Sequence, residues 1–184
     1  MVYEESALFD FPPDDDVRCL SVRQPDACLI VSGIKGVENR SRRPPRHLIG
    51  RRIAIHASLS RNERELSEEQ ARDASMSTVY YRDTRGAVIG DAILVGFYEP
   101  GDEPKNASDA IWWDRDCYGW ILRDARPAIE PIPAKGKLYM FRLQDDRANK
   151  RQARGVNENA VKELNSDTNS GTVPCKSKQT AFFN

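Results

Sequence analysis

The segment between Ser21 and Arg40 constrains the fold more than any other part of the chain. Its apolar run from Ala27 to Val31 stands between Pro25 and Gly33. Proline suits the first turn of a helix and glycine the position after its last turn, so the pattern predicts a two-turn helix. Three charged residues then follow within six positions: Lys35, Glu38 and Arg40. Charges of both signs are thus gathered beside a helix end, which indicates a polar site.

The alternation of side chains along a strand decides how these charges are arranged. If an extended segment begins at Val37, Glu38 and Arg40 share one face, because successive strand side chains point to opposite sides. An arginine fork suits a phosphate or a base edge, and a glutamate accepts a hydrogen bond from an amino group. The alternative is a plain ion pair, in which Glu38 neutralises Arg40 or Lys35 and no ligand is involved.

Several short motifs follow one another along the chain. They are Leu20-Ser21-Val22-Arg23-Gln24-Pro25, Gly33-x-Lys35-x-x-Glu38-x-Arg40, Ile55-His56-Ala57-Ser58, Gly86-Ala87-Val88-Ile89-Gly90, Tyr118-Gly119-Trp120, and Pro131-Ile132-Pro133 with Lys135-Gly136. In this order they resemble the ASCH domain family, small β-barrels related to PUA RNA-binding modules. The resemblance implies an α+β fold, a small PUA-like β-barrel with flanking helices, with a ligand cleft at Lys35, Glu38 and Arg40.

The resemblance also implies a domain that binds nucleic acid, RNA in the first place, or a modified nucleotide. The residues expected to contact the ligand are Ser21, Arg23, Gln24, Lys35, Glu38, Arg40, Arg42 and His56. Two alternatives stay open: Ser21 to Gln24 could instead cap the helix, and His56 could be a buried structural residue. Many relatives carry tryptophans where this chain has Asp26 and Arg42, so aromatic capture of a base is not expected at those two positions.

An enzymatic function is the alternative to binding. Some ASCH-like proteins are amidohydrolases on an acylated cytidine and pair a lysine with a threonine nucleophile. By position Lys35 matches that lysine, but Glu38 stands where the threonine would be. A small hydrolase of a modified nucleoside, or a ribonuclease, would therefore use Glu38 as a general base on water and Lys35 as its electrostatic partner. Both side chains are expected to lie outside the core. A third interpretation is an adaptor domain that binds a protein segment.

Charge is unevenly distributed, although the formal net charge of the chain is zero. Residues 1–16 hold six acidic and no basic residues, so residues 17–184 carry 0 − (−6) = +6. Six arginines and no acidic residue fall within residues 40–52, where Pro44, Pro45 and Gly50 indicate a loop. Like charges repel, so this loop predicts a polyanionic partner, either a nucleic-acid backbone or the acidic leader itself.

The remaining composition argues against several classes of protein. Four cysteines and two histidines lack the paired spacing of metal ligands, so no metal and no cofactor is expected. No apolar run approaches the twenty residues that a membrane helix needs, so a cytoplasmic protein with free thiols and no membrane contact is expected. The sequence does not indicate an oligomeric state.

The expected organisation is one domain, residues 17–143, between an acidic leader (1–16) and a polar tail (144–184), both expected to be disordered. Alternation and apolar runs predict strands at Val17–Val22, Arg52–Ala57, Gly86–Glu99, Tyr118–Leu122 and Lys137–Leu143. Gly90 predicts a bulge or a sharp bend within its strand. A Ser60–Glu63 capping box predicts a helix over Arg61–Ala74, and a helical turn is expected near Ala110–Trp113. Trp120 is expected in the core, and one of Trp112 and Trp113 on the surface.

Overall fold

The structure, a computed structural model, describes residues 17–60 and 64–143. The predictions for the leader, the tail and Glu63 lie outside these residues. Within them the strands are β1 (Arg18–Val22), β2 (Val37–Arg40), β3 (Arg52–Ala57), β4 (Ala87–Tyr98), β5 (Tyr118–Pro133) and β6 (Met140–Arg142). The helices are α1 (Asp26–Val31), α2 (Glu68–Ser75), α3 (Ala107–Trp112) and a short 3-10 helix, η1 (Arg46–Leu48).

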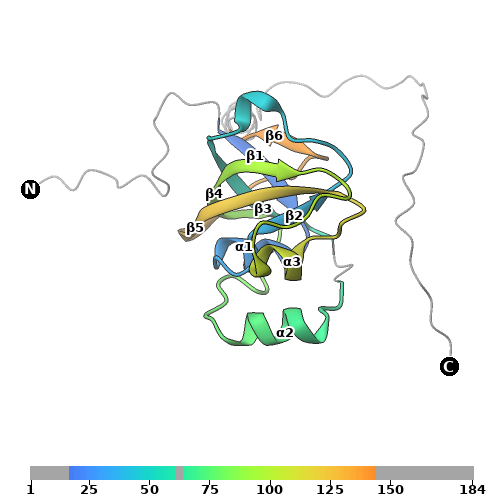
Figure 1. The fold of residues 1–184 in the computed structure, drawn as a ribbon. Helices are drawn as coiled ribbons and strands as arrows, with labels where there is room; N and C mark the ends of the chain where they lie inside the picture. Colours follow the sequence, from blue (N-terminus) through green and yellow to red (C-terminus); the bar gives the residue numbers. More distant parts are fainter. Residues whose placement is uncertain (1–16, 61–63, 144–184) are drawn as a thin grey trace, which may run out of the picture.

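The strands form one sheet in the order β2-β5-β4-β3-β1-β6 (Figure 1). β1 and β3 are parallel, and the other neighbouring pairs are antiparallel. Three strands separate β2 from β1 in this order, yet Arg40 Nη2 of β2 lies 2.6 Å from the Ser21 carbonyl oxygen of β1. The sheet therefore curls into a half-barrel whose open side lies between β2 and β1. A mixed, curled sheet with a few helices agrees with the predicted fold, but the backbone pairing of the described strands does not close it into a full barrel.

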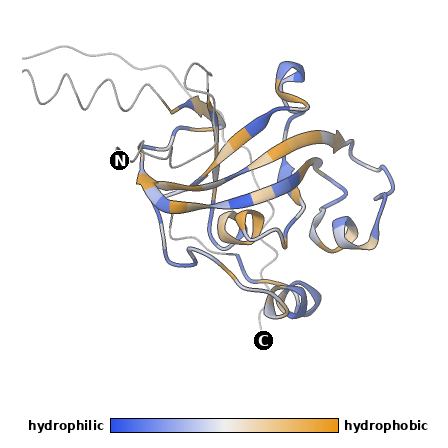
Figure 2. Ribbon diagram, turned by 90° about the vertical axis from the view of Figure 1, so that its left-hand side faces the viewer, coloured by the Kyte–Doolittle hydropathy of each residue, from blue (hydrophilic) through white to orange (hydrophobic). Residues whose placement is uncertain are grey.

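Helix α1 fills the concave centre of the molecule. Its residues from Ala27 to Val31 are all buried, and it packs against β3, β4 and β5. Gly33, with φ +76°, ends the helix turn in a conformation that glycine adopts without strain. Hydrophobic residues gather on the strands and on this helix, whereas α2 is largely hydrophilic (Figure 2). The two-turn helix predicted between Pro25 and Gly33 is confirmed.

The expected helix at Arg61–Ala74 is wrong at its start. The structure begins α2 at Glu68, and its capping box is formed by Ser67 and Gln70. A capping box satisfies the free backbone N–H groups of the helix turn that it occupies. In the structure Ser67 and Gln70 form that box, so the helix starts directly after Ser67. Residues 64–67 have no regular secondary structure. Figure 1 shows α1 and α3 against the sheet and α2 farther out.

The tryptophan prediction is corrected as well. Trp112 and Trp113 are both buried, because each has its own partner in the interior. Trp112 Nε1 donates to Asp73 of α2 at 2.8 Å, and Trp113 stacks on Tyr98 with ring centroids 4.6 Å apart. Trp120 is fully buried, as expected. No helix among the described residues is long and apolar enough to cross a membrane.

Candidate functional site

The three charged residues of the central motif meet at the open side of the half-barrel. Lys35 follows the turn at Gly33, and β2 then presents Glu38 and Arg40 on one face. Lys35 Nζ lies 2.5 Å from Glu38 Oε2, and Arg40 Nη2 lies 3.3 Å from Glu38 Oε1. The convergence expected from their spacing is therefore present in the structure.

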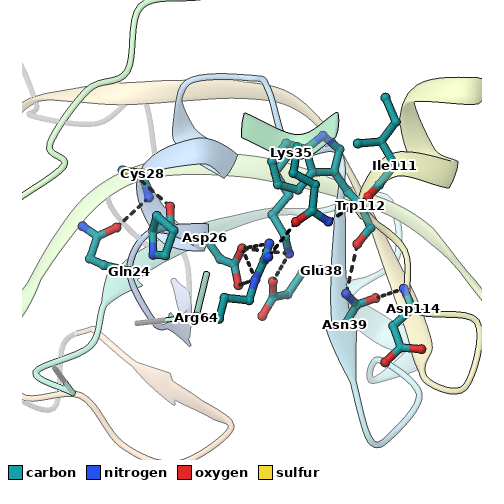
Figure 3. A network of polar contacts seen from close by, with 12 residues as sticks. Gln24, Asp26, Cys28, Lys35, Glu38, Asn39, Arg64, Ile111, Trp112 and Asp114 are labelled. Atoms are coloured by element: carbon teal, nitrogen blue, oxygen red, sulfur yellow. Dashed lines mark hydrogen bonds and ion pairs between the residues drawn. The ribbon is translucent and has the colours of Figure 1, made fainter. Parts of the chain in front are cut away.

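Two further charges extend this group, which we call the charged row: Arg64, Asp26, Lys35, Glu38 and Arg40. Asp26, in the first turn of α1, lies 3.8 Å from Lys35 Nζ (Figure 3). Arg64 approaches Asp26 with Nη2 at 2.6 Å from Oδ1 and Nε at 3.0 Å from Oδ2. Its guanidinium also lies 5.9 Å from the centre of the Trp112 ring. The row alternates in sign and carries one more cation than anion.

Burial makes this alternation necessary. Lys35 is 2% exposed and Glu38 is 7% exposed, so both charges are almost fully removed from water. An unpaired charge in such a place is strongly unfavourable, and the charged form persists only when opposite charges and hydrogen bonds replace the lost water. Lys35 has two carboxylates within 4 Å, and Glu38 has two cations. The expectation that Lys35 and Glu38 lie outside the core is thus wrong.

Arg40 leaves one donor of its guanidinium unused. Nη2 serves both Glu38 and the Ser21 carbonyl oxygen, whereas Nε is buried and has no hydrogen-bond partner in the described part of the chain. Buried polar groups in native proteins are almost always hydrogen-bonded. A ligand acceptor reaches this buried atom only if the Arg40 side chain, which is 19% exposed, shifts; a ligand that brings about this shift would satisfy the donor, so Arg40 is where the row can add an interaction.

Ser21 and His56 form a second layer behind Arg40. Ser21 Oγ lies 3.3 Å from His56 Nδ1, and His56 Nε2 lies 3.0 Å from the Ala134 carbonyl oxygen. His56 has no exposed surface. A Cβ at Gly136 would lie 2.4 Å from His56 Cε1, so the chain passes this ring at close range. The imidazole therefore ties the loop after β5 to β3, and its contact with Ser21 links it to the residue whose carbonyl oxygen accepts from Arg40.

The other three predicted contact residues take different places. The Gln24 side chain is buried; it accepts from Cys28 N at 3.1 Å and donates to the Tyr81 and Thr84 carbonyl oxygens. Both ends of that amide are used, which is a structural role at the start of α1. Arg23 and Arg42 are exposed and form no ion pair with the described carboxylates.

The arginine-rich loop is less repulsive than its sequence suggests. Three of its six arginines are paired with carboxylates: Arg40 with Glu38 of the same strand, Arg43 with Glu99 at 2.8 Å, and Arg52 with Asp91 and Asp124. Arg42, Arg46 and Arg51 are exposed and have no ion pair among the described residues. The unpaired charge of this loop, within the part that the structure describes, is therefore confined to three side chains.

The described residues near the charged row offer neither a metal site nor a reactive thiol. Among residues 17–60 and 64–143, no group of three or more His, Cys, Asp and Glu side chains could hold a metal ion. Burial raises the pKa of the Cys28 thiol to about 11, so the thiol is protonated near neutral pH and is no nucleophile. A cavity of about 300 Å³ is lined by the segment 33–36, which includes Lys35, and by residues of α3 and β5, but neither Glu38 nor Arg40 lines it.

Sequence reasoning missed two members of the row. Asp26 was noted only as the replacement of a tryptophan, although its place after Pro25 puts a carboxylate in the first turn of α1. Arg64 gave no signal at all, because 38 residues separate it from Asp26 and no local pattern links them. Long-range ion pairs of this kind follow from the packing of α2 beside α3 and not from spacing.

No family model and no curated protein matches the chain. Solved structures similar to it include crystal structures of the ASCH protein from Zymomonas mobilis. That protein is 18% identical, over 77% of this chain and 95% of its own, with a TM-score of 0.43. Two of its single-residue variants are 20% and 22% identical, cover 76% and 78% of this chain and 98% and 99% of theirs, and have the same TM-score of 0.43. The family is the one that the sequence motifs resemble.

Proposed function

We propose that this chain is an ASCH-like domain that binds nucleic acid, in the first place RNA, or a nucleotide, around the motif Gly33-x-Lys35-x-x-Glu38-x-Arg40. The observation that carries the proposal is the unsatisfied Nε of Arg40, at the end of a buried charged row on the open side of the half-barrel. A phosphate or base-carbonyl oxygen is the acceptor that an arginine fork takes best.

The exposed arginines near the site support the same ligand class. Arg23 follows β1 directly, and Arg42 follows β2, so the two flank the open side of the half-barrel. Neither is paired with a described carboxylate. Cations without carboxylate partners are free to contact a phosphate backbone, which is the main source of affinity for nucleic acids. The row would then fix one nucleotide while these arginines hold its neighbours.

A hydrolase is the second candidate, and the close Lys35–Glu38 pair favours it. Its general base would be Glu38, which must accept a proton from water. Both of its carboxylate oxygens, however, already lie beside cations, Oε2 beside Lys35 and Oε1 beside Arg40. One of these ion pairs would have to open before Glu38 could take a proton, so the resting geometry favours binding over turnover.

Substitution of Arg40 tests the proposal directly. Arg40→Lys keeps the charge and removes the fork, so affinity for single-stranded RNA should fall by about 1.5 kcal/mol, roughly tenfold. Arg115→Lys, in an exposed pair with Glu103, is the matched control and should leave affinity unchanged. Fluorescence anisotropy with a labelled oligonucleotide measures both. Failure of the wild-type chain to bind RNA or any nucleotide would overturn the proposal.

The same samples separate binding from catalysis. The wild-type chain is incubated with N4-acylated cytidine and with single-stranded RNA, and the products are analysed by chromatography. A binding domain leaves both compounds intact. Turnover by the wild type that Glu38→Gln abolishes, with affinity nearly unchanged, would replace the proposal by the hydrolase, because a general base acts in the transition state and not in ground-state binding.

A further inference from the structure

An aromatic surface lies on the same face of the sheet as the charged row. Cross-strand partners share a face, and Arg40 of β2 stands directly opposite Tyr118 of β5. Glu38 stands opposite Trp120, and Trp120 in turn stands opposite Phe97 of β4. The row therefore continues, without a change of face, into a set of aromatic residues on the next two strands.

One arginine covers two of these rings. The guanidinium carbon of Arg43 lies 6.0 Å from the centroid of the Phe97 ring and 5.8 Å from that of Tyr118. The two rings are 6.4 Å apart and inclined at 56°. A flat guanidinium over an aromatic ring occupies the place that a nucleobase takes when it stacks on such a ring. Phe97 and Tyr118 are half-buried, which leaves part of each ring accessible.

The backbone around Arg43 is fixed, whereas its side chain is not. Trp120 Nε1 donates to the Arg42 carbonyl oxygen at 2.8 Å, and Tyr139 Oη donates to the Arg43 carbonyl oxygen at 3.1 Å. The Arg43 side chain itself is 52% exposed; it forms an ion pair with Glu99, which is 48% exposed, and a hydrogen bond with the Tyr118 side chain. A surface pair of this kind contributes little, so a competing phosphate can draw the guanidinium away while the loop stays in place.

We propose that Phe97, Tyr118 and Arg43 form a stacking site for an unpaired base of single-stranded RNA. The inference rests on the proposed function and deepens it, since it names the form of nucleic acid that the surface takes. The base would lie on the rings, and its flanking phosphates would reach Arg40 and Arg42. Every base has a flat face, so such a site accepts any sequence, and it discriminates against duplexes, whose bases are already stacked.

The stacking site would supply aromatic contacts that are missing at residues 26 and 42. Asp26 and Arg42 replace tryptophans of many relatives, which removed the expected aromatic contacts at those positions. The rings of Phe97 and Tyr118 supply such contacts from β4 and β5, on the face that the row shares. Aromatic capture of a base is therefore available to this chain from a different pair of strands.

The test compares a strand with bases and a strand without them. The probes are a labelled ten-nucleotide oligouridylate and an abasic ribose-phosphate strand of equal length and charge. The wild-type full chain should bind the oligouridylate more tightly. The double substitution Phe97→Leu, Tyr118→Leu keeps apolar side chains and should weaken oligouridylate binding by about tenfold, without changing the affinity for the abasic strand. Tyr118→Phe should retain wild-type affinity. The control is Tyr80→Leu, at an exposed tyrosine outside the stacking site, and its affinity should also match that of the wild type.

The outcomes separate this inference from the proposed function. Binding of neither probe by the wild type overturns both. Equal affinity for the two probes, or an unchanged oligouridylate affinity in the double variant, overturns the stacking site and leaves RNA binding standing. Because the double variant has to fold, its thermal unfolding is measured first. An independent measurement on the wild-type chain is photo-crosslinking with 5-iodouridine RNA: cross-links at Phe97 or Tyr118 are expected, and cross-links found only elsewhere contradict the proposal.

Discussion

At the scale of single residues, Lys35 and Glu38 combine two roles that the sequence alone does not reveal together. They lie at the polar site, and they are also nearly as buried as the hydrophobic core around them. The sequence indicated their convergence because strand alternation is a local rule. It could not indicate their burial, since that depends on how β2 packs against β5 and α3 and on the distant Asp26 and Arg64 contacts. A loss of binding on substitution therefore has to be separated from a loss of stability.

A double-mutant cycle measures how much these two substitutions change the stability. Glu38→Gln leaves the Lys35 ammonium buried with only the more distant Asp26, so it should lower the free energy of unfolding by about 3–5 kcal/mol. Lys35→Met leaves Glu38 with Arg40 and should cost less. The double variant Lys35→Met, Glu38→Gln should lose clearly less than the sum, because neither buried charge remains unpaired. Urea unfolding measures all four forms, and strict additivity would show that the ion pair contributes nothing.

At the scale of elements, the sequence predicted those parts whose signals are local. Pro25 and Gly33 marked the two ends of α1, and the patterns of apolar residues located β1, β3 and the start of β5, Tyr118–Leu122. The start of α2 was misplaced, because the prediction relied on the Ser60–Glu63 pair, whereas the structure forms the capping box at Ser67 and Gln70. β5 extends to Pro133, beyond the predicted Leu122, because the segment after the left-handed Asp124 pairs again with β4.

At Gly90 the structure adds detail to the prediction made from the sequence. The register between β3 and β4 shifts here, since the neighbours Ile55 and His56 pair with Gly90 and Val88; Ile89 is therefore an extra residue in β4, as the predicted bulge requires. A Cβ there would lie 2.3 Å from the Arg126 carbonyl oxygen and 2.6 Å from Val31 Cγ1, so α1 and β5 both approach the glycine closely. Gly90→Ala should lower the free energy of unfolding by about 1–3 kcal/mol or more, because backbone atoms have to move.

Gly96, in the same strand, provides the control for that substitution. A Cβ at Gly96 would meet only Ile121 Cδ1, at 4.0 Å. Gly96→Ala should therefore change the stability by no more than about 0.5 kcal/mol, and a slight gain is possible, since alanine restricts the unfolded chain. Thermal or urea unfolding distinguishes the two variants. Equal effects at the two positions would mean that the close approach to α1 does not constrain β4.

At the scale of the whole molecule, the decisive property is where charge is left unpaired. The curled sheet brings Asp91 of β4 and Asp124 of β5 to Arg52. It also brings Glu99, the residue after β4, to Arg43. The loop of residues 40–52 therefore offers a polyanion three unpaired arginines, and not six: Arg42, Arg46 and Arg51. This number sets the expected salt dependence of binding, because each phosphate contact releases counterions from the nucleic acid.

The last prediction concerns that salt dependence. Replacing Arg42, Arg46 and Arg51 by alanine should flatten the plot of log affinity for single-stranded RNA against log salt by up to about 2, since each lost contact removes about 0.7 from the slope. The control replaces Arg72, Arg82 and Arg115, three exposed arginines outside the loop, and has the same net charge. Its slope should stay near that of the wild type. An equal flattening in both triple variants would mean that net charge, and not this loop, attracts the RNA.

A shortened chain completes the experiment, because the acidic residues 1–16 are the other polyanion that could meet the loop. If they compete with RNA, a chain beginning at Val17 should bind more tightly than the full chain, and the difference should shrink as salt screens the charges.

The shortened chain carries +6 instead of zero, so part of any gain in affinity is non-specific. The triple variant of the loop identifies the specific part: a competing leader gives a gain on shortening that Arg42→Ala, Arg46→Ala and Arg51→Ala together abolish. A gain that survives in the triple variant places the contact elsewhere, and equal affinities of the full and shortened wild-type chains at low salt exclude competition by residues 1–16.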